Sequence, residues 1–127
     1  MRTVLDTSAL YYPRALALLQ DQGGDIVLPV VALVERARQL RRAGRDGWSD
    51  MVLLAEASGW TVEAYDVAEA RRTAALAPLD ARAWARINRD AMIAGHVAKE
   101  DVLWTANPRD FAALGLRPAQ ILDVAKL

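Results

Sequence analysis

The chain has 127 residues, the size of one domain, and 16 basic residues balance 16 acidic residues. Cysteine is absent, which excludes disulfide bonds and thiolate-bound zinc. A balanced charge disfavours a passive nucleic-acid-binding protein, which usually carries a basic excess. No apolar run approaches the roughly 20 residues of a membrane span, and the N-terminal residues do not have the pattern of a signal peptide. The sequence therefore predicts a single cytoplasmic domain over residues 1–127, with no membrane segment.

Strand and helix patterns alternate along the first half of the chain. In chain order they predict a strand over residues 3–5, a helix over 9–20, a strand over 26–28 and helices over 29–44 and 46–57. A hydroxyl of Thr7 or Ser8 is expected to cap the first of these helices. Gly23-Gly24 ends it, and Pro29 suits the first turn of the next one.

The second half continues the alternation. It predicts a strand over residues 61–65, helices over 67–77 and 88–99, a strand over 102–105, a short helix over 110–114 and a last strand over 121–124. Residues 80–87 are expected to form a loop with one or two helical turns. Repeated β-α units of this kind predict an α/β fold with three layers, in which helices cover both faces of a mostly parallel sheet of four to five strands.

Four acidic residues stand at or near the expected carboxyl edge of this sheet. Asp6 ends the first strand, Glu35 lies on the helix after the second, and Asp90 and Asp110 begin later helices. Each one also fits a structural role: a helix cap for Asp6 and Asp110, an ion pair with Arg38 for Glu35, and a favourable helix-dipole contact for Asp90. Only when the four acids are considered together do they suggest a catalytic or metal-binding site.

Ligands of parallel α/β sheets gather at the carboxyl ends of the strands. Carboxylates that converge there repel one another unless a cation lies between them, and Mg²⁺ and Mn²⁺ prefer such hard oxygen ligands. The sequence therefore predicts a catalytic metal site that contains Asp6, Glu35, Asp90 and Asp110. The polar residues expected to orient these carboxylates are Thr7, Ser8, Thr105 and Asn107.

Four segments in the same order resemble the PIN-domain family. They are MRTVLDTSAL at residues 1–10, LPVVALVE at 28–35, RDAMIA at 89–94 and LWTANPRDF at 103–111. The resemblance is closest to the short PIN proteins that are toxins of VapBC toxin–antitoxin pairs. It implies a PIN-like α/β/α fold, a Mg²⁺- or Mn²⁺-dependent endoribonuclease with Asp6, Glu35, Asp90 and Asp110 as its acids, a homodimer, and inhibition by a cognate antitoxin protein.

Two features depart from the family pattern. His96 and the pair Glu100-Asp101 stand where family members usually have small residues and a glycine-containing turn. Asp101 thus competes with Asp110 as the fourth acid, and the match of residues 107–111 to the family favours Asp110. His96 is expected to be a packed or surface residue and not a catalyst.

Several other side chains are candidates for contacts with RNA or with a partner. Arg38 and Arg42, with Arg41 and Arg45 beside them, could follow the RNA backbone, although a solvated helix face paired with nearby acids is the slightly favoured explanation. Trp48 and Trp84 could stack on bases, whereas Trp60 and Trp104 are expected in the core. The apolar positions expected to be exposed for an antitoxin are Leu10, Tyr11 and Leu53.

Other classes of α/β protein fit less well. A phosphoacceptor receiver domain needs a pair of acids after its first strand and a lysine after its fifth, and a haloacid-dehalogenase phosphatase needs Asp-x-Asp where this chain has Asp6-Thr7-Ser8. A non-catalytic PIN-like protein that acts through partner binding remains the alternative. The presence of all four acids favours metal-assisted hydrolysis of RNA phosphodiesters.

Overall fold

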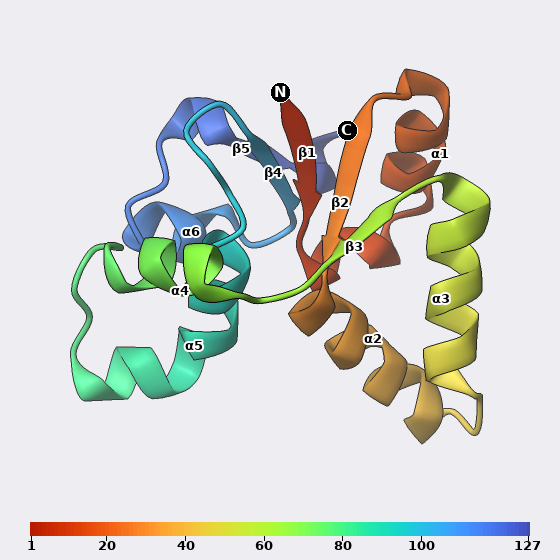
Figure 1. Ribbon diagram of the computed structural model, residues 1–127, viewed down its shortest axis with the longest axis horizontal. Coiled ribbons are helices and arrows are strands. Elements are labelled where there is room, and N and C mark those ends of the chain that lie inside the picture. The colour runs from red at the N-terminus through yellow and green to blue at the C-terminus, as the bar shows by residue number, and fades with distance from the viewer.

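A five-stranded parallel sheet forms the centre of the molecule (Figure 1). The structure is a computed structural model that describes all 127 residues. The spatial order of the strands is β3-β2-β1-β4-β5, and every neighbouring pair is parallel. The strands are β1 (Arg2–Leu5), β2 (Asp25–Pro29), β3 (Thr61–Glu63), β4 (Val102–Thr105) and β5 (Ile121–Asp123). This arrangement confirms the predicted α/β class and the parallel sheet.

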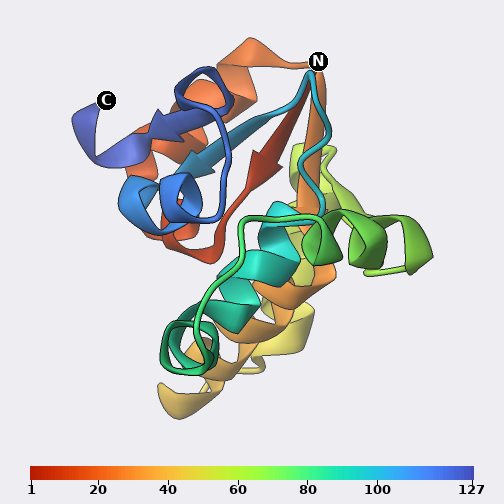
Figure 2. The same ribbon diagram turned by 90° about the vertical axis from the view of Figure 1, so that its left-hand side faces the viewer.

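Helices cover both faces of the sheet. The α-helices are α1 (Pro13–Gln22), α2 (Val30–Arg42), α3 (Gly47–Ser58), α4 (Val67–Ala74), α5 (Ala81–Ala94) and α6 (Pro108–Ala113), and short 3₁₀ turns are η1 (Thr7–Tyr11), η2 (Pro118–Gln120) and η3 (Val124–Lys126). Figures 1 and 2 show α1 and α3 on one side of the central strands and α4, α5 and α6 on the other, so the predicted three layers are present. No helix has the length and apolar character required to span a bilayer.

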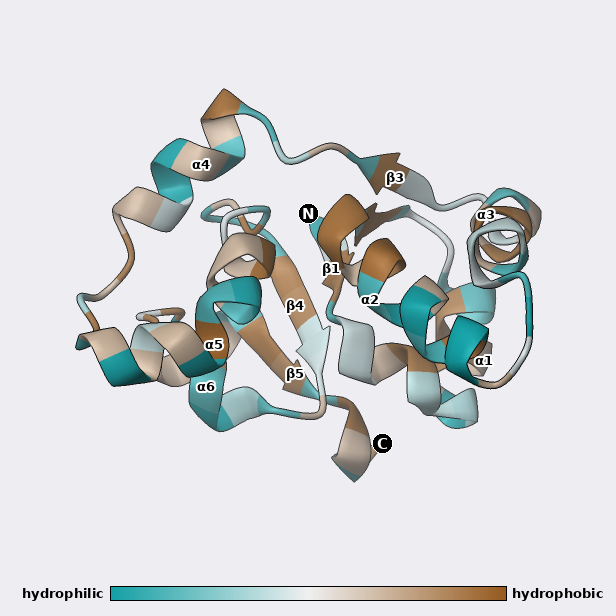
Figure 3. Cartoon of the chain, turned by 90° about the horizontal axis from the view of Figure 1, so that it is seen from below, coloured by the Kyte–Doolittle hydropathy of each residue, from teal (hydrophilic) through white to brown (hydrophobic).

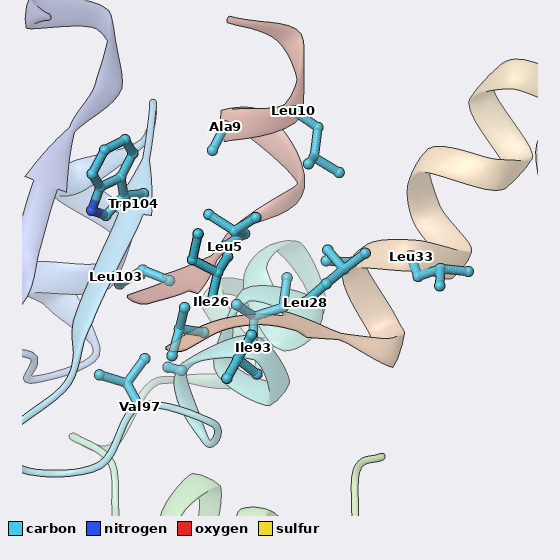
Figure 4. Close-up of a cluster of buried hydrophobic side chains, with 14 of the residues drawn as sticks. Leu5, Ala9, Leu10, Ile26, Leu28, Leu33, Ile93, Val97, Leu103 and Trp104 are labelled. Atoms are coloured by element: carbon cyan, nitrogen blue, oxygen red, sulfur yellow. The ribbon is translucent and has the colours of Figure 1, made fainter. Parts of the chain in front are cut away.

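The core lies between the sheet and the helices on each face. In Figure 4 the strand residues Leu5, Leu28 and Leu103 meet Ile93 from α5, and all four side chains are fully buried. Figure 3 shows hydrophobic residues along β4 and β5 and many hydrophilic residues on the surrounding helices. Trp60 and Trp104 are buried, as the sequence predicted. Burial of this apolar set supplies the main driving force for folding.

The first predicted helix is divided in two. Residues Thr7–Tyr11 form a 3₁₀ turn, and α1 begins at Pro13 because proline is well suited to the first turn of a helix. The predicted hydroxyl cap is wrong: the residue before η1 makes no side-chain cap, and the hydroxyls of Thr7 and Ser8 instead bond to acids. Pro29 ends β2 in an extended conformation and does not lie within the first turn of α2.

The segment predicted as a loop at residues 80–87 belongs to α5. The Asp80 side chain accepts a hydrogen bond from the backbone N–H of Ala83 at 2.8 Å, which caps the helix, and Ile87 kinks it. The helix ends at Ala94 and not at residue 99. The guanidinium groups of Arg72 and Arg2 bind the freed carbonyls of Gly95 (2.6 Å) and His96 (2.9 Å), contacts between distant residues that no local pattern reveals. The third strand and the helix after it are also shorter than predicted, at Thr61–Glu63 and Val67–Ala74.

Candidate functional site

Asp6 is buried at the carboxyl end of β1, with 2% of its surface exposed. Its Oδ2 atom accepts hydrogen bonds from Ser8 Oγ at 2.6 Å and from Thr105 Oγ1 at 2.8 Å. Burial raises the pKa of Asp6, although these hydrogen bonds act in the opposite direction. Ser8 and Thr105, both expected to orient the acids, therefore contact the same carboxylate although they lie 97 residues apart in the sequence.

Glu35 lies on the first turns of α2, close to Asp6. Thr7 Oγ1 donates to Glu35 Oε1 at 3.0 Å, and Arg89 Nη1 lies 3.6 Å from Glu35 Oε2. Burial raises the pKa of Glu35, while the Thr7 hydrogen bond and the Arg89 charge oppose the shift. The ion pair with Arg38, which offered a purely structural role for Glu35, does not form, because the cationic partner comes from α5.

Asp90 has the strongest electrostatic signature of the four acids. Burial first, and then the charges of Asp6, Asp110 and Glu35, raise the pKa of Asp90 to about 7. These contributions require that the fold bring the other three carboxylates close enough for their charges to act on Asp90. One pocket of about 250 Å³ is lined by Asp6, Thr7, Ser8, Tyr11, Glu35, Gln39, Asp90 and Asn107; we refer to it as the acid pocket.

The two candidates for the fourth acid lie at opposite ends of β4. Asp110, on α6 after the strand, pairs with Arg86 Nη1 at 3.2 Å and lines a hollow beside Asn107. Asp101, before the strand, bonds to Arg2 Nη2 at 3.0 Å and to the backbone N–H of Ala98 at 2.9 Å. Although partial burial opposes the shift, these contacts hold the pKa of Asp101 below its usual value. These contacts give Asp101 a structural role, because its carboxylate already binds Arg2 and the backbone N–H of Ala98.

Arg86 and Arg89 are functional candidates that the sequence analysis missed. Each places a guanidinium on one of the four acids, Asp110 and Glu35 respectively, and each side chain is largely exposed. The spacing in the sequence could have indicated Arg86, which precedes Asp90 by four residues and so shares one face of a helix with it. The prediction missed Arg86 because it placed residues 80–87 in a loop outside that helix.

A groove between α2 and α5 lies next to the acid pocket. Its volume is about 580 Å³, and its lining residues are Val30, Val31, Val34, Glu35, Arg38, Gln39, Arg42, Arg89 and Met92. Glu35 and Gln39 line both hollows, so the groove and the acid pocket are adjacent. Arg38 and Arg42, predicted for the RNA backbone, line this groove, whereas Arg45 is held by Asp50 at 2.8 Å.

Other predicted surface residues divide into correct and incorrect assignments. Tyr11 (48% exposed) and Leu53 (63%) are accessible, but Leu10 is 6% exposed and packs in the core, so its assignment as an antitoxin contact is wrong. The helix predicted to expose it is a 3₁₀ turn, which directs this side chain inward. Trp48 and Trp84 are exposed.

Metal-ligand spacing is found at a place that the sequence analysis did not predict. Glu63, Glu69 and His96 could hold a metal ion, since each offers one ligand atom and these atoms lie within 4.8 Å of one another. His96 is fully buried, in agreement with the expectation that it is a packed residue. None of the three lines the acid pocket, so the molecule contains a second candidate site.

Comparison with solved structures supports the fold. The chain is similar to one in the crystal structure of DNA-bound VapBC from Salmonella typhimurium, with a TM-score of 0.60, 19% sequence identity, and coverage of 98% of each chain. Similarity over both full lengths agrees with the PIN-like fold that the sequence predicted. Neither the family models nor the curated proteins compared with the chain match it.

The raised pKa of Asp90 predicts a stability that falls as pH rises in the metal-free protein. In the unfolded chain this carboxyl has its ordinary pKa of 3.8 and loses its proton near pH 4, whereas the folded chain keeps the proton up to about pH 7. Folding therefore binds a proton in this window, and stability decreases from about pH 4 to pH 7. Because solvent screens part of the charge, we expect Asp90→Asn to raise the free energy of unfolding by about 1–2 kcal/mol at high pH.

Thermal unfolding in the presence of chelator tests this prediction. We expect Asp90→Asn and wild type to unfold at similar temperatures near pH 4, and the variant to unfold a few degrees higher near pH 8. A difference between the two proteins that does not change with pH would show that Asp90 titrates normally. A saturating divalent ion should reverse the order at high pH, because only the wild type keeps the carboxylate.

Proposed function

We propose that this chain is a Mg²⁺- or Mn²⁺-dependent endoribonuclease, and that it acts as the toxin of a VapBC-type pair in the cytoplasm. The observation that carries the proposal is the convergence of Asp6, Glu35, Asp90 and Asp110, where burial first and then the charges of the other three acids raise the pKa of Asp90 to about 7. Carboxylates that only cap helices do not need to face one another. Repulsion among carboxylates is unfavourable unless a cation relieves it, so their convergence favours a metal-dependent enzyme over a non-catalytic PIN-like protein.

The donor set fits a hard divalent cation. The four side chains offer only carboxylate oxygens, which Mg²⁺ and Mn²⁺ prefer, and their mutual repulsion is what a cation between them would relieve. In our proposal Asp6, Asp90 and Glu35 hold the ion, and Asp110 assists directly or through water. When bound, such an ion supplies activation of the attacking water and neutralises charge on the phosphate.

The remaining residues of the site position these acids and the substrate. Hydrogen bonds from Ser8 and Thr105 to Oδ2 fix the direction of the Asp6 carboxylate. Thr7 does the same for Glu35, leaving Oε2 toward Arg89. Backbone N–H groups of Ala106 and Asn107 donate to Ser8 Oγ and Thr105 Oγ1, so both hydroxyls direct their protons to the acid.

The groove between α2 and α5 is the proposed path of the RNA backbone. Arg38, Arg42 and Arg89 line it, and guanidinium groups can bind phosphate with two hydrogen bonds. We further propose that a cognate antitoxin binds the chain and that the chain forms a homodimer. The similarity to a chain of a VapBC complex and the resemblance of the four sequence segments support these partners.

Cleavage of total RNA by the purified protein, read by end-sequencing, tests the proposal. Mg²⁺ or Mn²⁺ should produce cuts at defined positions, and chelator should prevent them. A protein that cuts no RNA with either ion would contradict the nuclease proposal and favour partner binding as the function. The positions of the cuts would identify the RNA substrate.

Asp101 and Asp110 should respond differently to substitution. Asp110→Asn is expected to reduce the cleavage rate about tenfold or more, because it removes a charge that acts on Asp90. Asp101→Asn is expected to leave the rate within about twofold but to lower stability by about 1–3 kcal/mol, because it weakens the contacts with Arg2 and Ala98. Initial rates at saturating Mg²⁺ and thermal unfolding measure both effects; the reverse pattern would make Asp101 the fourth acid.

A further inference from the structure

Glu63, Glu69 and His96 come together on the face of the sheet covered by α4 and α5. Glu63 ends β3, Glu69 lies on α4, and His96 lies two residues after the end of α5. Figures 1 and 2 show α4 beside α5, with the chain from β3 leading into α4. The three ligand atoms lie within 4.8 Å of one another, and no residue of this group belongs to the acid pocket. The group is therefore separate from the proposed nuclease site.

Two buried polar atoms in this group have no hydrogen-bond partner. Glu63 Oε1 lies 2.7 Å from His96 Nδ1, and a neutral imidazole that donates from Nδ1 carries a bare lone pair on Nε2. That Nε2 atom and Glu69 Oε2 are both buried and without a partner, and their residues are 0% and 8% exposed. Such atoms are rare in folded proteins, and two acceptors close together need a positive group between them.

The surrounding charges favour a divalent cation over a proton. Arg2 contacts Glu63 at 2.5 Å and Asp101 at 3.0 Å, so one guanidinium serves two carboxylates, and the Glu69 carboxylate nearby has no cationic partner. With all three ionised, two negative charges remain uncompensated, and a single divalent ion would balance them. No hydrogen bond joins Glu69 to His96. Ligand atoms of one zinc ion are held about 3–4 Å apart, since each bond measures about 2.0–2.2 Å.

We propose that Glu63, Glu69 and His96 form a zinc site. His96 Nε2 and the Glu69 carboxylate approach the ion, and Glu63 holds the imidazole through Nδ1, the arrangement common behind metal-binding histidines. The mixed nitrogen and oxygen donors select Zn²⁺ over Mg²⁺, which prefers oxygen ligands and retains its waters. Because Glu69 lies on α4, His96 follows α5 and Glu63 of β3 holds the imidazole, the ion would link these elements and stabilise the side of the molecule that carries Asp90.

The single histidine of the chain makes the test specific. A protein without a histidine tag, carrying Asp6→Asn and Asp90→Asn to weaken metal binding in the acid pocket, is titrated with ZnCl₂ near neutral pH. We expect the ¹⁵N signal of His96 Nε2 to shift until one equivalent is added, and the unfolding temperature to rise. Glu69→Gln in this background should weaken Zn²⁺ binding at least about tenfold, since it removes one of two ligands.

Glu100→Gln is the matched control, because Glu100 is an exposed acid near His96 and outside the group. This variant should bind Zn²⁺ like its parent. Unchanged imidazole signals and an unchanged unfolding temperature on addition of Zn²⁺ would overturn the proposal without reference to any variant of Glu69. An imidazole that is doubly protonated near neutral pH and insensitive to Zn²⁺ would also overturn it, because a proton would then bridge the carboxylates.

Discussion

We expect Asp6→Asn to lower the rate of RNA cleavage about a thousandfold, the largest effect on activity in this chain. Asp6 is the most buried of the four acids, and two hydroxyls fix its Oδ2 atom. Asparagine keeps the shape and can still accept these hydrogen bonds, but it removes the negative charge that holds a cation. A loss of about 4 kcal/mol of metal-dependent transition-state stabilisation corresponds to this factor.

Asp25→Asn is the control for this prediction. Asp25 is exposed at the opposite end of the sheet, where β2 begins. Initial cleavage rates of the three proteins at saturating Mg²⁺ provide the measurement. Wild type and Asp25→Asn should cut RNA equally, and circular dichroism should show the same fold for all three. An Asp6→Asn protein as active as wild type would contradict the assignment of the metal ligands.

The order of the elements and the nature of the site were accessible from local patterns. Short apolar runs such as residues 26–28 identify buried strands, and an acid directly after a strand, as in Asp6, falls on the edge where parallel α/β proteins bind ligands. The neighbouring hydroxyls were predictable for the same reason, since Ser8 is two residues from Asp6 and Thr105 ends the strand that pairs with β1.

Contacts between distant residues were not accessible in this way. Arg89 reaches Glu35 from another helix, and Arg2 at the first strand binds the carbonyl that ends α5. The cluster of Glu63, Glu69 and His96 exists only because three elements meet on one face of the sheet. Leu10 was misplaced because a 3₁₀ turn and an α-helix direct the same residue differently. Local periodicity carries no information on any of these.

The role of Gly47 is also hidden from local sequence patterns, because it depends on Ala37, a residue of another helix ten positions earlier. A Cβ atom at this position would lie 2.0 Å from the backbone oxygen of Ala37 in α2, so α3 can approach α2 only through glycine. We expect Gly47→Ala to destabilise the protein by about 3 kcal/mol, because the clash is with backbone and no side chain can move aside. The intrinsic preference of helices for alanine, worth about 1 kcal/mol, would act in the opposite direction.

Ala57→Gly separates packing from helix preference. Ala57 is exposed near the end of the same helix, so losing its methyl group should cost no more than about 1 kcal/mol. In thermal or urea unfolding, adding one methyl at residue 47 should therefore harm the protein more than removing one at residue 57. A Gly47→Ala protein as stable as wild type would mean that α3 can shift away from α2. Because α2 carries Glu35 and Arg38, a lower cleavage rate in a folded Gly47→Ala protein would place the packing of these two helices among the requirements of the site.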